Sequence, residues 1–183
     1  MVELPDDTST RRLGEALAHV VHAGDVVVLT GELGAGKTTL TQGIGAGLQV
    51  RGAITSPTFV IARVHPSQRP GGGPALVHVD AYRLGNSLEF DDLDLGTDLA
   101  AAVVVVEWGD GLAEGLSGDR LHVRLAIDAA AEASEDALAD WGAAPRRATI
   151  TPVGSRWHTD AARAALLRLA ESAADAEPDG SSR

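Results

Sequence analysis

Residues 25–48 read DVVVLTGELGAGKTTLTQGIGAGL. The apolar run at 26–30 predicts a short buried strand, and apolar residues at positions 40, 44 and 48 predict a helix over 37–48. Between the two, residues 31–38 fit the pattern G-x-x-x-x-G-K-[ST] at every fixed position. A strand, a glycine-rich turn and a helix in this order predict a loop that binds phosphate groups.

The chemistry of such a loop requires each part of the pattern. Glycines let successive backbone N–H groups curl around an anion, and the following helix directs its positive end to the same point. Lys37 is the only lysine among 15 basic residues, and it places a mobile charge where β- and γ-phosphates bind. The hydroxyl of Thr38 can bind Mg²⁺. We expect the nucleotide to contact Gly31, Glu32, Leu33, Gly34, Ala35, Gly36, Lys37, Thr38 and Thr39.

The lysine count also bears on the base of the nucleotide. Guanine-specific P-loop proteins usually read the base with an Asn-Lys-x-Asp motif. Because the chain has no second lysine, it cannot form that motif, and we expect ATP rather than GTP.

The rest of the chain alternates helical and strand patterns. Residues 8–22 have apolar residues at helical spacing, with Thr8 or Ser9 as a candidate cap and Gly24 as the end. A Pro/Gly-rich turn separates two strand-like runs, 59–64 and 75–79, which we expect to pair antiparallel. Further elements are a central parallel strand at 101–106, half-buried strands at 121–127 and 148–153, and a closing helix at 160–170. This order predicts the α/β class: a P-loop NTPase fold with a mixed, mostly parallel sheet flanked by helices.

Composition limits the other possibilities. The chain has 183 residues, 44% of them hydrophobic, and suits a single domain, which we place at 1–170. It has no apolar stretch of membrane-spanning length, no signal segment and no cysteine, so we expect a cytoplasmic protein without disulfides. A net charge of −11 and an aromatic content of 3% argue against direct binding of DNA or RNA.

Acidic residues are concentrated in particular segments. The segments 86–98 and 128–140 each hold five acids and no basic residue, which is typical of solvated faces or loops. The end of the chain, 171–183, is polar and poor in hydrophobic residues, and predicts a disordered tail.

Two carboxylates at strand ends are candidates for binding Mg²⁺. Glu107 follows four valines, a position that is costly for a charge unless it faces a site. Asp80 ends the run LVHVD, in which His78 shares its strand face. We expect His78 to contact a ligand residue or simply to pack, rather than to bind metal. Thr58, in the segment TSPTF at 55–59, could place a hydroxyl near the γ-phosphate, as switch loops do.

The motifs GELGAGKTT, SPTF, HVDAYRL and VVEW, in this order and at these separations, resemble the TsaE (YjeE) family of bacterial ATPases. The resemblance covers about residues 4–127 and the strand near 146–153. It implies a small P-loop ATPase that uses ATP and Mg²⁺ and assists threonylcarbamoyl modification of adenosine 37 in tRNA. It also implies the partners TsaB and TsaD, with TsaD performing the transfer, so that tRNA is reached only indirectly.

The resemblance implies catalytic roles for residues within the quoted motifs. Thr38 and Glu107 would hold Mg²⁺. Asp80 would position or activate the attacking water, or contact the metal itself. Thr58 would be the hydroxyl of the switch loop, and Trp108 would lie beside the site and support hydrolysis.

Other implied features lie outside the motifs. Contacts to the adenine or ribose would come from Asp7 and from Arg146 or Arg147. The acidic, alanine-rich stretch 128–145 stands where members of the family usually have a shorter turn, so we expect it to be a surface insertion.

Two other functions are open at this point. A small-molecule kinase of similar size would carry an arginine-bearing lid, for which the chain offers arginines but no compact lid signature: Arg120, Arg124, Arg146 and Arg147. A binding module could instead use ATP only to dock a partner, without significant turnover. Phosphorylation of an acceptor would identify the kinase, and phosphate release that requires Glu107 would exclude the pure docking module.

Overall fold

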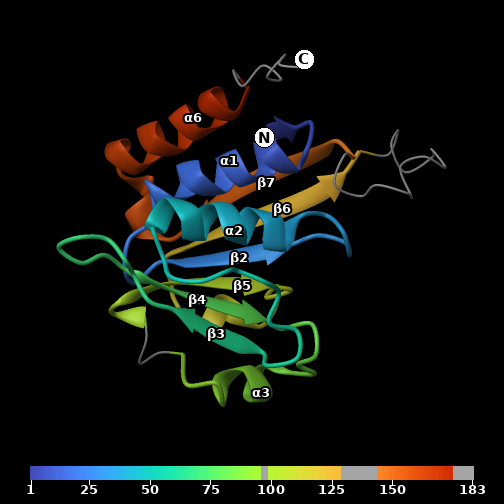
Figure 1. The fold of residues 1–183 in the computed structure, drawn as a ribbon, viewed down its shortest axis with the longest axis vertical. Coiled ribbons are helices and arrows are strands. Elements are labelled where there is room, and N and C mark those ends of the chain that lie inside the picture. Colours follow the sequence, from blue (N-terminus) through green and yellow to red (C-terminus); the bar gives the residue numbers. More distant parts are fainter. Residues whose placement is uncertain (96–98, 129–143, 175–183) are drawn as a thin grey trace.

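Seven strands form one sheet, with helices packed against it (Figure 1). The computed structural model describes residues 1–95, 99–128 and 144–174. In these residues the strands lie in the order β1-β7-β6-β2-β5-β4-β3. Their bounds are β1 Val2–Leu4, β2 Val26–Thr30, β3 Ala62–His65, β4 Ala75–Asp80, β5 Ala102–Glu107, β6 Arg120–Ile127 and β7 Arg146–Val153.

The centre of the sheet is parallel. β2 pairs in parallel with β5 and β6, and β4 with β5, whereas β1, β3 and β7 add antiparallel pairs at the sides. The four valines at 103–106 are fully buried, because a central parallel strand is covered on both faces. Parallel pairing brings the carboxyl ends of β2, β4 and β5 to one edge, where open α/β sheets bind ligands.

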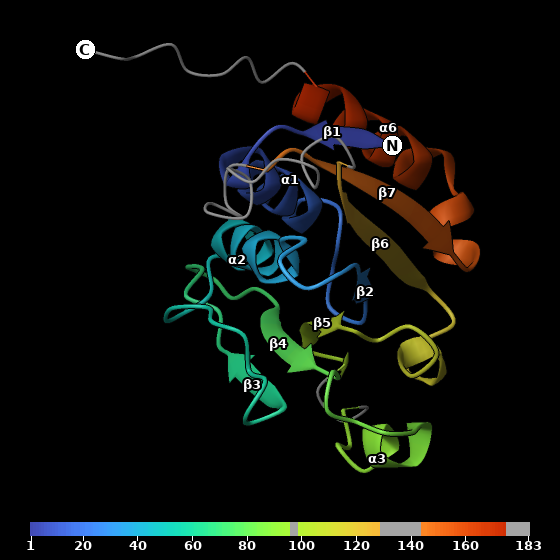
Figure 2. The same cartoon turned by 90° about the vertical axis from the view of Figure 1, so that its right-hand side faces the viewer.

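Three long helices cover one face of the sheet (Figures 1 and 2): α1 Asp7–Ala18, α2 Lys37–Leu48 and α6 Asp160–Ala174. They enclose a hydrophobic cluster that includes Leu13, Leu40 and Val105. A second cluster lies on the opposite face, where Phe90 of the short helix α3 (Ser87–Asp91) packs with the even-numbered valines of β5. Two short 3-10 helices lie in connecting segments: η1 Ala113–Gly115 between β5 and β6, and η2 Ser155–His158 between β7 and α6.

The predicted first helix is wrong at both ends. α1 begins at Asp7, and its cap is Asp6 rather than Thr8 or Ser9. The Asp6 carboxylate accepts the backbone N–H of Ser9 at 2.7 Å, while the Ser9 hydroxyl accepts that of Asp6 at 3.1 Å, a reciprocal cap. The helix ends at Ala18 instead of continuing toward Gly24, because the Asp25 carboxylate accepts the N–H of His22 at 2.7 Å and holds a turn there.

The predicted strand at 59–64 begins too early. The N–H groups of Val60 and Ile61 both donate to the carbonyl of Pro57, at 2.9 and 2.7 Å, and Ile61 has a φ of 67°. The chain is therefore turned until Ala62, where β3 begins and pairs antiparallel with β4 as predicted. No sequence signal marks β1, whose three residues are ordered by pairing with β7.

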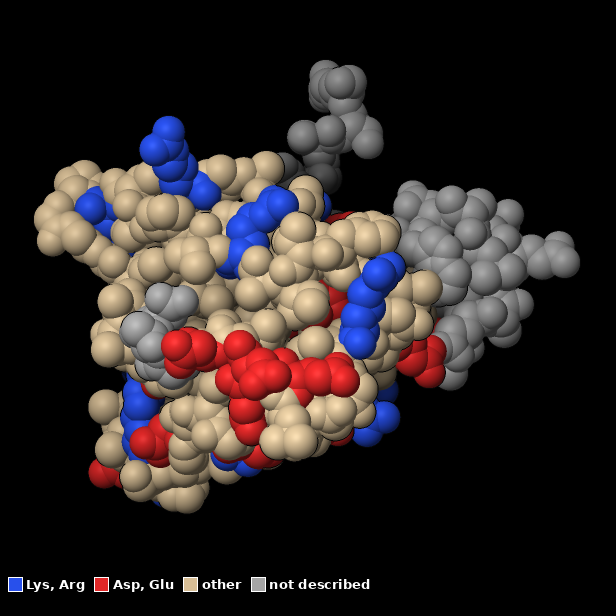
Figure 3. Space-filling view, turned by 90° about the horizontal axis from the view of Figure 1, so that it is seen from below, with Lys and Arg blue, Asp and Glu red and all other residues tan. Residues whose placement is uncertain are grey.

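Exposed acids mark the end of the molecule that carries α3. Within the acidic stretch 86–98, Glu89, Asp91 and Asp92 are exposed, and Figure 3 shows acidic side chains gathered across the face seen from that end. Residues 129–143 of the predicted insertion lie outside the described residues. The closing helix α6 extends to Ala174 and so reaches into the segment predicted as a tail; residues 175–183 also lie outside the described part of the chain.

A bilayer crossing needs a long apolar helix. No helix in the described ranges has both the length and the apolar character for it.

Candidate functional site

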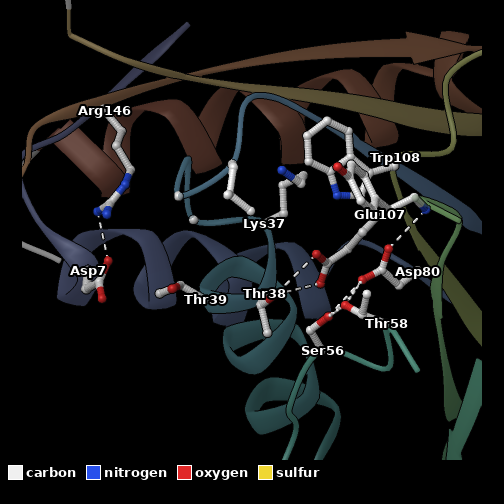
Figure 4. Close-up of a pocket in the computed structure, with 14 residues that line it drawn as sticks. Asp7, Lys37, Thr38, Thr39, Ser56, Thr58, Asp80, Glu107, Trp108 and Arg146 are labelled. Atoms are coloured by element: carbon white, nitrogen blue, oxygen red, sulfur yellow. Dashed lines mark hydrogen bonds and ion pairs between the residues drawn. The ribbon is translucent and has the colours of Figure 1, made fainter. Parts of the chain in front are cut away.

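A pocket of about 540 Å³ opens at the carboxyl ends of β4 and β5, beside the loop that joins β2 to α2 (Figure 4). Its lining brings together residues from distant parts of the sequence: Asp7, Leu33, Gly34, Gly36, Lys37, Thr38, Thr39, Ser56, Thr58, Asp80, Tyr82, Glu107, Trp108 and Arg146. Most of the residues singled out from sequence therefore share one cavity.

The loop between β2 and α2 has the backbone that its glycines predict. Gly34 and Gly36 have φ angles of 81° and 94°, in a region where residues with a side chain are strained. Gly36 caps α2, and no acidic residue lies in the first turn of that helix. The first backbone N–H groups of α2 and the positive end of its dipole are thus available to an anion.

Lys37 lies inside the pocket and is 5% exposed. Its ammonium donates to the carbonyls of Gly31 and Glu32, both at 2.8 Å, and lies 3.7 Å from the centre of the Trp108 ring. Burial lowers the pKa of Lys37, while two nearby carboxylates act in the opposite direction. An anion entering the pocket would meet a charge that is already largely desolvated, which strengthens their attraction.

Glu107 ends β5 and is 3% exposed. The Thr38 hydroxyl donates to its carboxylate, 2.9 Å from Oε1 and 3.1 Å from Oε2. His78 Nε2 lies 2.7 Å from Oε1. Of the two roles expected for His78, contact with a ligand residue or simple packing, the structure therefore shows contact with a candidate ligand residue. Hydroxyl and carboxylate oxygens are the ligands that Mg²⁺ prefers, and this donor set fits that cation.

Asp80 ends β4 directly beside Glu107 in the parallel register. Its Oδ2 accepts the hydroxyls of Ser56 at 2.7 Å and Thr58 at 2.5 Å, and its Oδ1 accepts the Tyr82 backbone N–H at 3.1 Å. Burial raises the pKa of Asp80, but the two hydroxyls and the backbone N–H outweigh it and hold the pKa below its ordinary value. The carboxylate is therefore charged at neutral pH and can accept a hydrogen bond from water.

Trp108 occupies a strained turn immediately after β5. Its φ of 60° is unfavourable for a large side chain and persists only where the surroundings enforce it. Its backbone N–H donates to the Leu29 carbonyl at 2.9 Å, and its ring packs on Tyr82 with centroids 5.2 Å apart. The turn places the indole over Lys37 instead of in solvent.

Asp7 and Arg146 form the opposite side of the pocket (Figure 4). Arg146 is 2% exposed, and its Nη1 lies 2.8 Å from Asp7 Oδ1. Arg147, the alternative that the sequence left open, is exposed on the other face of β7 and pairs with Glu3 at 2.7 Å. Of the two arginines, Arg146 is therefore the one placed to contact a bound molecule.

Three predicted contact residues do not line the pocket. Gly31 is crowded against the carbonyl of Leu125, Glu32 offers its carbonyl to Lys37, and Ala35 is buried in the core. Two lining residues were missed, namely Ser56 and Tyr82. Both stand inside quoted motifs, but a serine before a proline and an aromatic after an acid acquire a role only when the fold brings them to Asp80.

The mixed sheet with its parallel centre, the glycine-rich loop with Lys37 and Thr38, and the acid at the neighbouring strand end together define the P-loop NTPase fold. Comparison with known families narrows the class. The model of the family described as threonylcarbamoyl adenosine biosynthesis protein TsaE matches residues 4–135. The chain belongs to this TsaE family, which serves the biosynthesis of threonylcarbamoyladenosine in tRNA, as the motifs predict.

Relatives and a solved structure agree with this assignment. The chain is 57% identical over 150 residues to the tRNA threonylcarbamoyladenosine biosynthesis protein TsaE of Streptomyces coelicolor, covering 81% of this chain and 94% of that protein. It is 59% identical over 128 residues to the protein of the same name from Mycobacterium tuberculosis, with coverages of 67% and 76%. The crystal structure of YdiB from Bacillus subtilis superposes with a TM-score of 0.63 at 27% identity, covering 93% of both chains.

Proposed function

We propose that this chain is a Mg²⁺-dependent ATPase that acts with TsaB and TsaD in the threonylcarbamoyl modification of adenosine 37 in tRNA. The observation that carries the proposal is the contact of the Thr38 hydroxyl with the Glu107 carboxylate, at 2.9 and 3.1 Å. This contact brings the phosphate loop and Glu107, at the end of the neighbouring strand, together in one group of oxygen atoms, and Asp80 lies beside Glu107.

In this proposal the residues of the pocket divide the work of phosphoryl transfer to water. The loop N–H groups and Lys37 hold the phosphates. Thr38 and Glu107 would hold Mg²⁺, which when bound would supply positive charge against the transferring group. Asp80, held charged by two hydroxyls, orients the attacking water or contacts the metal. The water oxygen bonds to the γ-phosphorus as the bond from that phosphorus to the ADP oxygen breaks, and a water proton is released to solvent, leaving ADP and free phosphate.

Other residues support binding and order. Asp7 and Arg146 contact the adenine or ribose. Thr58 is the switch-loop residue that places its hydroxyl near the γ-phosphate. Trp108 shields Lys37 from solvent at 3.7 Å. Thr58 and Tyr82 stand on the partly exposed rim of the pocket. We therefore expect partner binding to complete the site, and hydrolysis by the chain alone to be slow.

The surface charge supports an indirect approach to tRNA. The chain carries a net charge of −11, and acidic side chains gather on the face shown in Figure 3. Such a surface repels a phosphate backbone, so tRNA reaches the assembly through TsaB and TsaD.

A phosphate-release assay tests the proposal. The purified chain with ATP and Mg²⁺ should release phosphate slowly, and addition of TsaB and TsaD should raise the rate. The same mixture should complete the tRNA modification over repeated cycles. Glu107→Ala should abolish release while reducing ATP affinity only modestly, because it removes an interaction that matters most in the transition state.

Three outcomes would contradict the proposal. Stimulation by tRNA alone, or no effect of the two proteins, would overturn the assembly. Near-normal release by Glu107→Ala would remove that acid from the catalytic group. Transfer of a labelled γ-phosphate to a small metabolite would identify a kinase instead.

A further inference from the structure

Glu107 has a second buried contact, which hydrolysis as proposed does not use. His78 lies on β4 with its side chain fully buried, and in the register it pairs with Val105. Side chains two residues apart share a face of a strand, so the imidazole reaches diagonally across to Glu107. Nε2 lies 2.7 Å from Oε1.

The surroundings of the imidazole define where its proton lies. Nε2 faces a carboxylate oxygen, whereas Nδ1 is buried and has no hydrogen-bond partner in the described ranges. A proton on Nδ1 would be a buried donor without an acceptor, which is unfavourable. The tautomer with hydrogen on Nε2 satisfies the carboxylate and leaves only a lone pair on Nδ1.

We propose that His78 is a positioning residue that fixes the Glu107 carboxylate against the hydroxyl of Thr38. This rests on the proposed role of Glu107 as a metal ligand. One hydroxyl shared between Oε1 and Oε2 leaves a glutamate, with its three rotatable bonds, free to rotate. A second donor on Oε1 removes that freedom and keeps Oε2 directed at the corner where a cation binds. Partners of this kind orient the ligands of metal sites in proteins.

His65 provides a matched control for simple packing. It lies on the adjacent strand β3 and is 3% exposed, so it is buried nearly as completely as His78. Its Nδ1 lies 3.3 Å from the carbonyl of Arg51 and not against a carboxylate. A substitution at His65 therefore disturbs a buried histidine without changing how Glu107 is held.

The test compares two variants of His78 that differ in how far along the side chain they place an N–H donor. His78→Gln places an amide N–H about as far along the side chain as Nε2, whereas the amide of His78→Asn reaches only as far as Nδ1. The full chain with a non-hydrolysable ATP analogue is titrated with Mn²⁺, which binds oxygen sites like those of Mg²⁺, and free Mn²⁺ is followed by electron paramagnetic resonance. Affinity for the analogue in EDTA is measured in parallel.

His78→Asn should weaken Mn²⁺ binding by about 10- to 100-fold, and His78→Gln should restore most of it. His65→Asn should bind Mn²⁺ like the wild type, and analogue affinity in EDTA should be unchanged in all variants. Equal losses in the Asn and Gln variants, or no loss in either, would show that His78 only packs. If the wild-type chain binds Mn²⁺ in this His78-dependent way yet releases no phosphate, the positioning role is supported and the proposed ATPase activity is contradicted.

A measurement on the wild-type chain requires no variant to fold. ¹⁵N NMR of the imidazole nitrogens should show that His78 carries hydrogen on Nε2, the nitrogen that faces Glu107. A proton on Nδ1 alone would overturn the proposal, because Nε2 would then have nothing to donate.

Discussion

At the scale of single residues, the phosphate end of the pocket depends on Lys37, which lies near two carboxylates. Lys37 is buried between two backbone carbonyls and the Trp108 ring, and it faces Glu107 and Asp80. Its hydrogen bonds go to the carbonyls of Gly31 and Glu32 and not to either carboxylate, so its charge remains available to an incoming phosphate.

Replacing Lys37 with alanine tests that position. ATP affinity should fall by about 1.5–3 kcal/mol, the contribution of a hydrogen bond to a charged group, and hydrolysis should fall further. Titration calorimetry with ATP measures the binding term. Lys37→Arg is the control: it keeps the charge but spreads it over a wide planar group, so it should recover only part of the affinity. Unchanged affinity in the alanine variant would place the nucleotide elsewhere.

Ser56 should influence stability through the charge of Asp80. Because the folded-state pKa of Asp80 lies below its ordinary value of 3.8, the stabilisation is present above pH 3.8 and is lost as pH falls through the lowered pKa. Ser56→Ala removes one donor at 2.7 Å and should cost about 1 kcal/mol at pH 7, with the difference from wild type shrinking as the pH falls below 3.8.

Urea unfolding at a series of pH values measures this difference. Thr55→Ala is the matched control, since the Thr55 hydroxyl bonds to Arg63 and not to Asp80. A destabilisation by Ser56→Ala that is constant with pH would mean that the serine does not act through the carboxylate.

At the scale of elements, α1 and α2 approach each other through glycines. A Cβ on Gly14 would overlap the carbonyl of Leu40, and one on Gly43 would overlap the carbonyl of Arg11. Gly47 makes a similar approach, with Glu15 O 2.8 Å from an added Cβ. The two backbones thus pack closer than larger residues allow, and this contact sets the position of α2 and its N-terminus at the pocket.

Gly43→Ala should therefore destabilise the fold although alanine favours helices. Overpacking against backbone costs about 1–3 kcal/mol and exceeds the gain in helix propensity of about 1 kcal/mol. Thermal and urea unfolding measure the change. At Gly118 an added Cβ would contact nothing within 4 Å, so Gly118→Ala should be nearly neutral. A stabilised Gly43→Ala variant would contradict the close approach.

At the scale of the whole molecule, Arg156 joins the segment after β7 to the turn between α1 and β2. Its Nη2 lies 2.6 Å from the Asp25 carboxylate and 3.0 Å from the Val20 carbonyl, and its guanidinium stacks on Trp157 at 4.0 Å. It thereby holds η2, and α6 after it, to the turn between α1 and β2. Burial raises the pKa of Asp25, against the opposing effects of the His22 N–H and Arg156.

Arg156→Ala should destabilise the protein by about 2 kcal/mol at pH 7, because it leaves a buried carboxylate without its counter-charge. The loss should shrink at low pH, where a protonated Asp25 needs no partner, and Asp25→Asn in the same chain should restore part of the stability. Urea unfolding measures all three. The exposed arginine of the Arg147–Glu3 pair is the control, and Arg147→Ala should change little. An equal loss in both arginine variants would exclude a special role for Arg156.

The local sequence determined the central unit of the fold. β2 and α2 have the bounds predicted for them, because a continuous apolar run and a glycine-rich loop with a following 3.6-residue period are local signals. The same signals predicted the parallel neighbour β5 and, with the motifs around Asp80 and Glu107, the family. Local patterns were misleading near Phe59 and His22, where hydrogen bonds to a carbonyl and to a carboxylate turn the chain.

The assembly of the site was decided only by tertiary structure. The choice of Arg146 over Arg147 follows from the pleat of β7, which turns one toward Asp7 and the other toward Glu3. The contacts of Ser56 with Asp80 and of His78 with Glu107 join residues 24 and 29 positions apart. Sequence patterns report which residue types a segment favours, whereas a hydrogen bond of 2.7 Å depends on strand register and on the direction of each side chain. These are fixed only when the whole sheet pairs and packs against its helices.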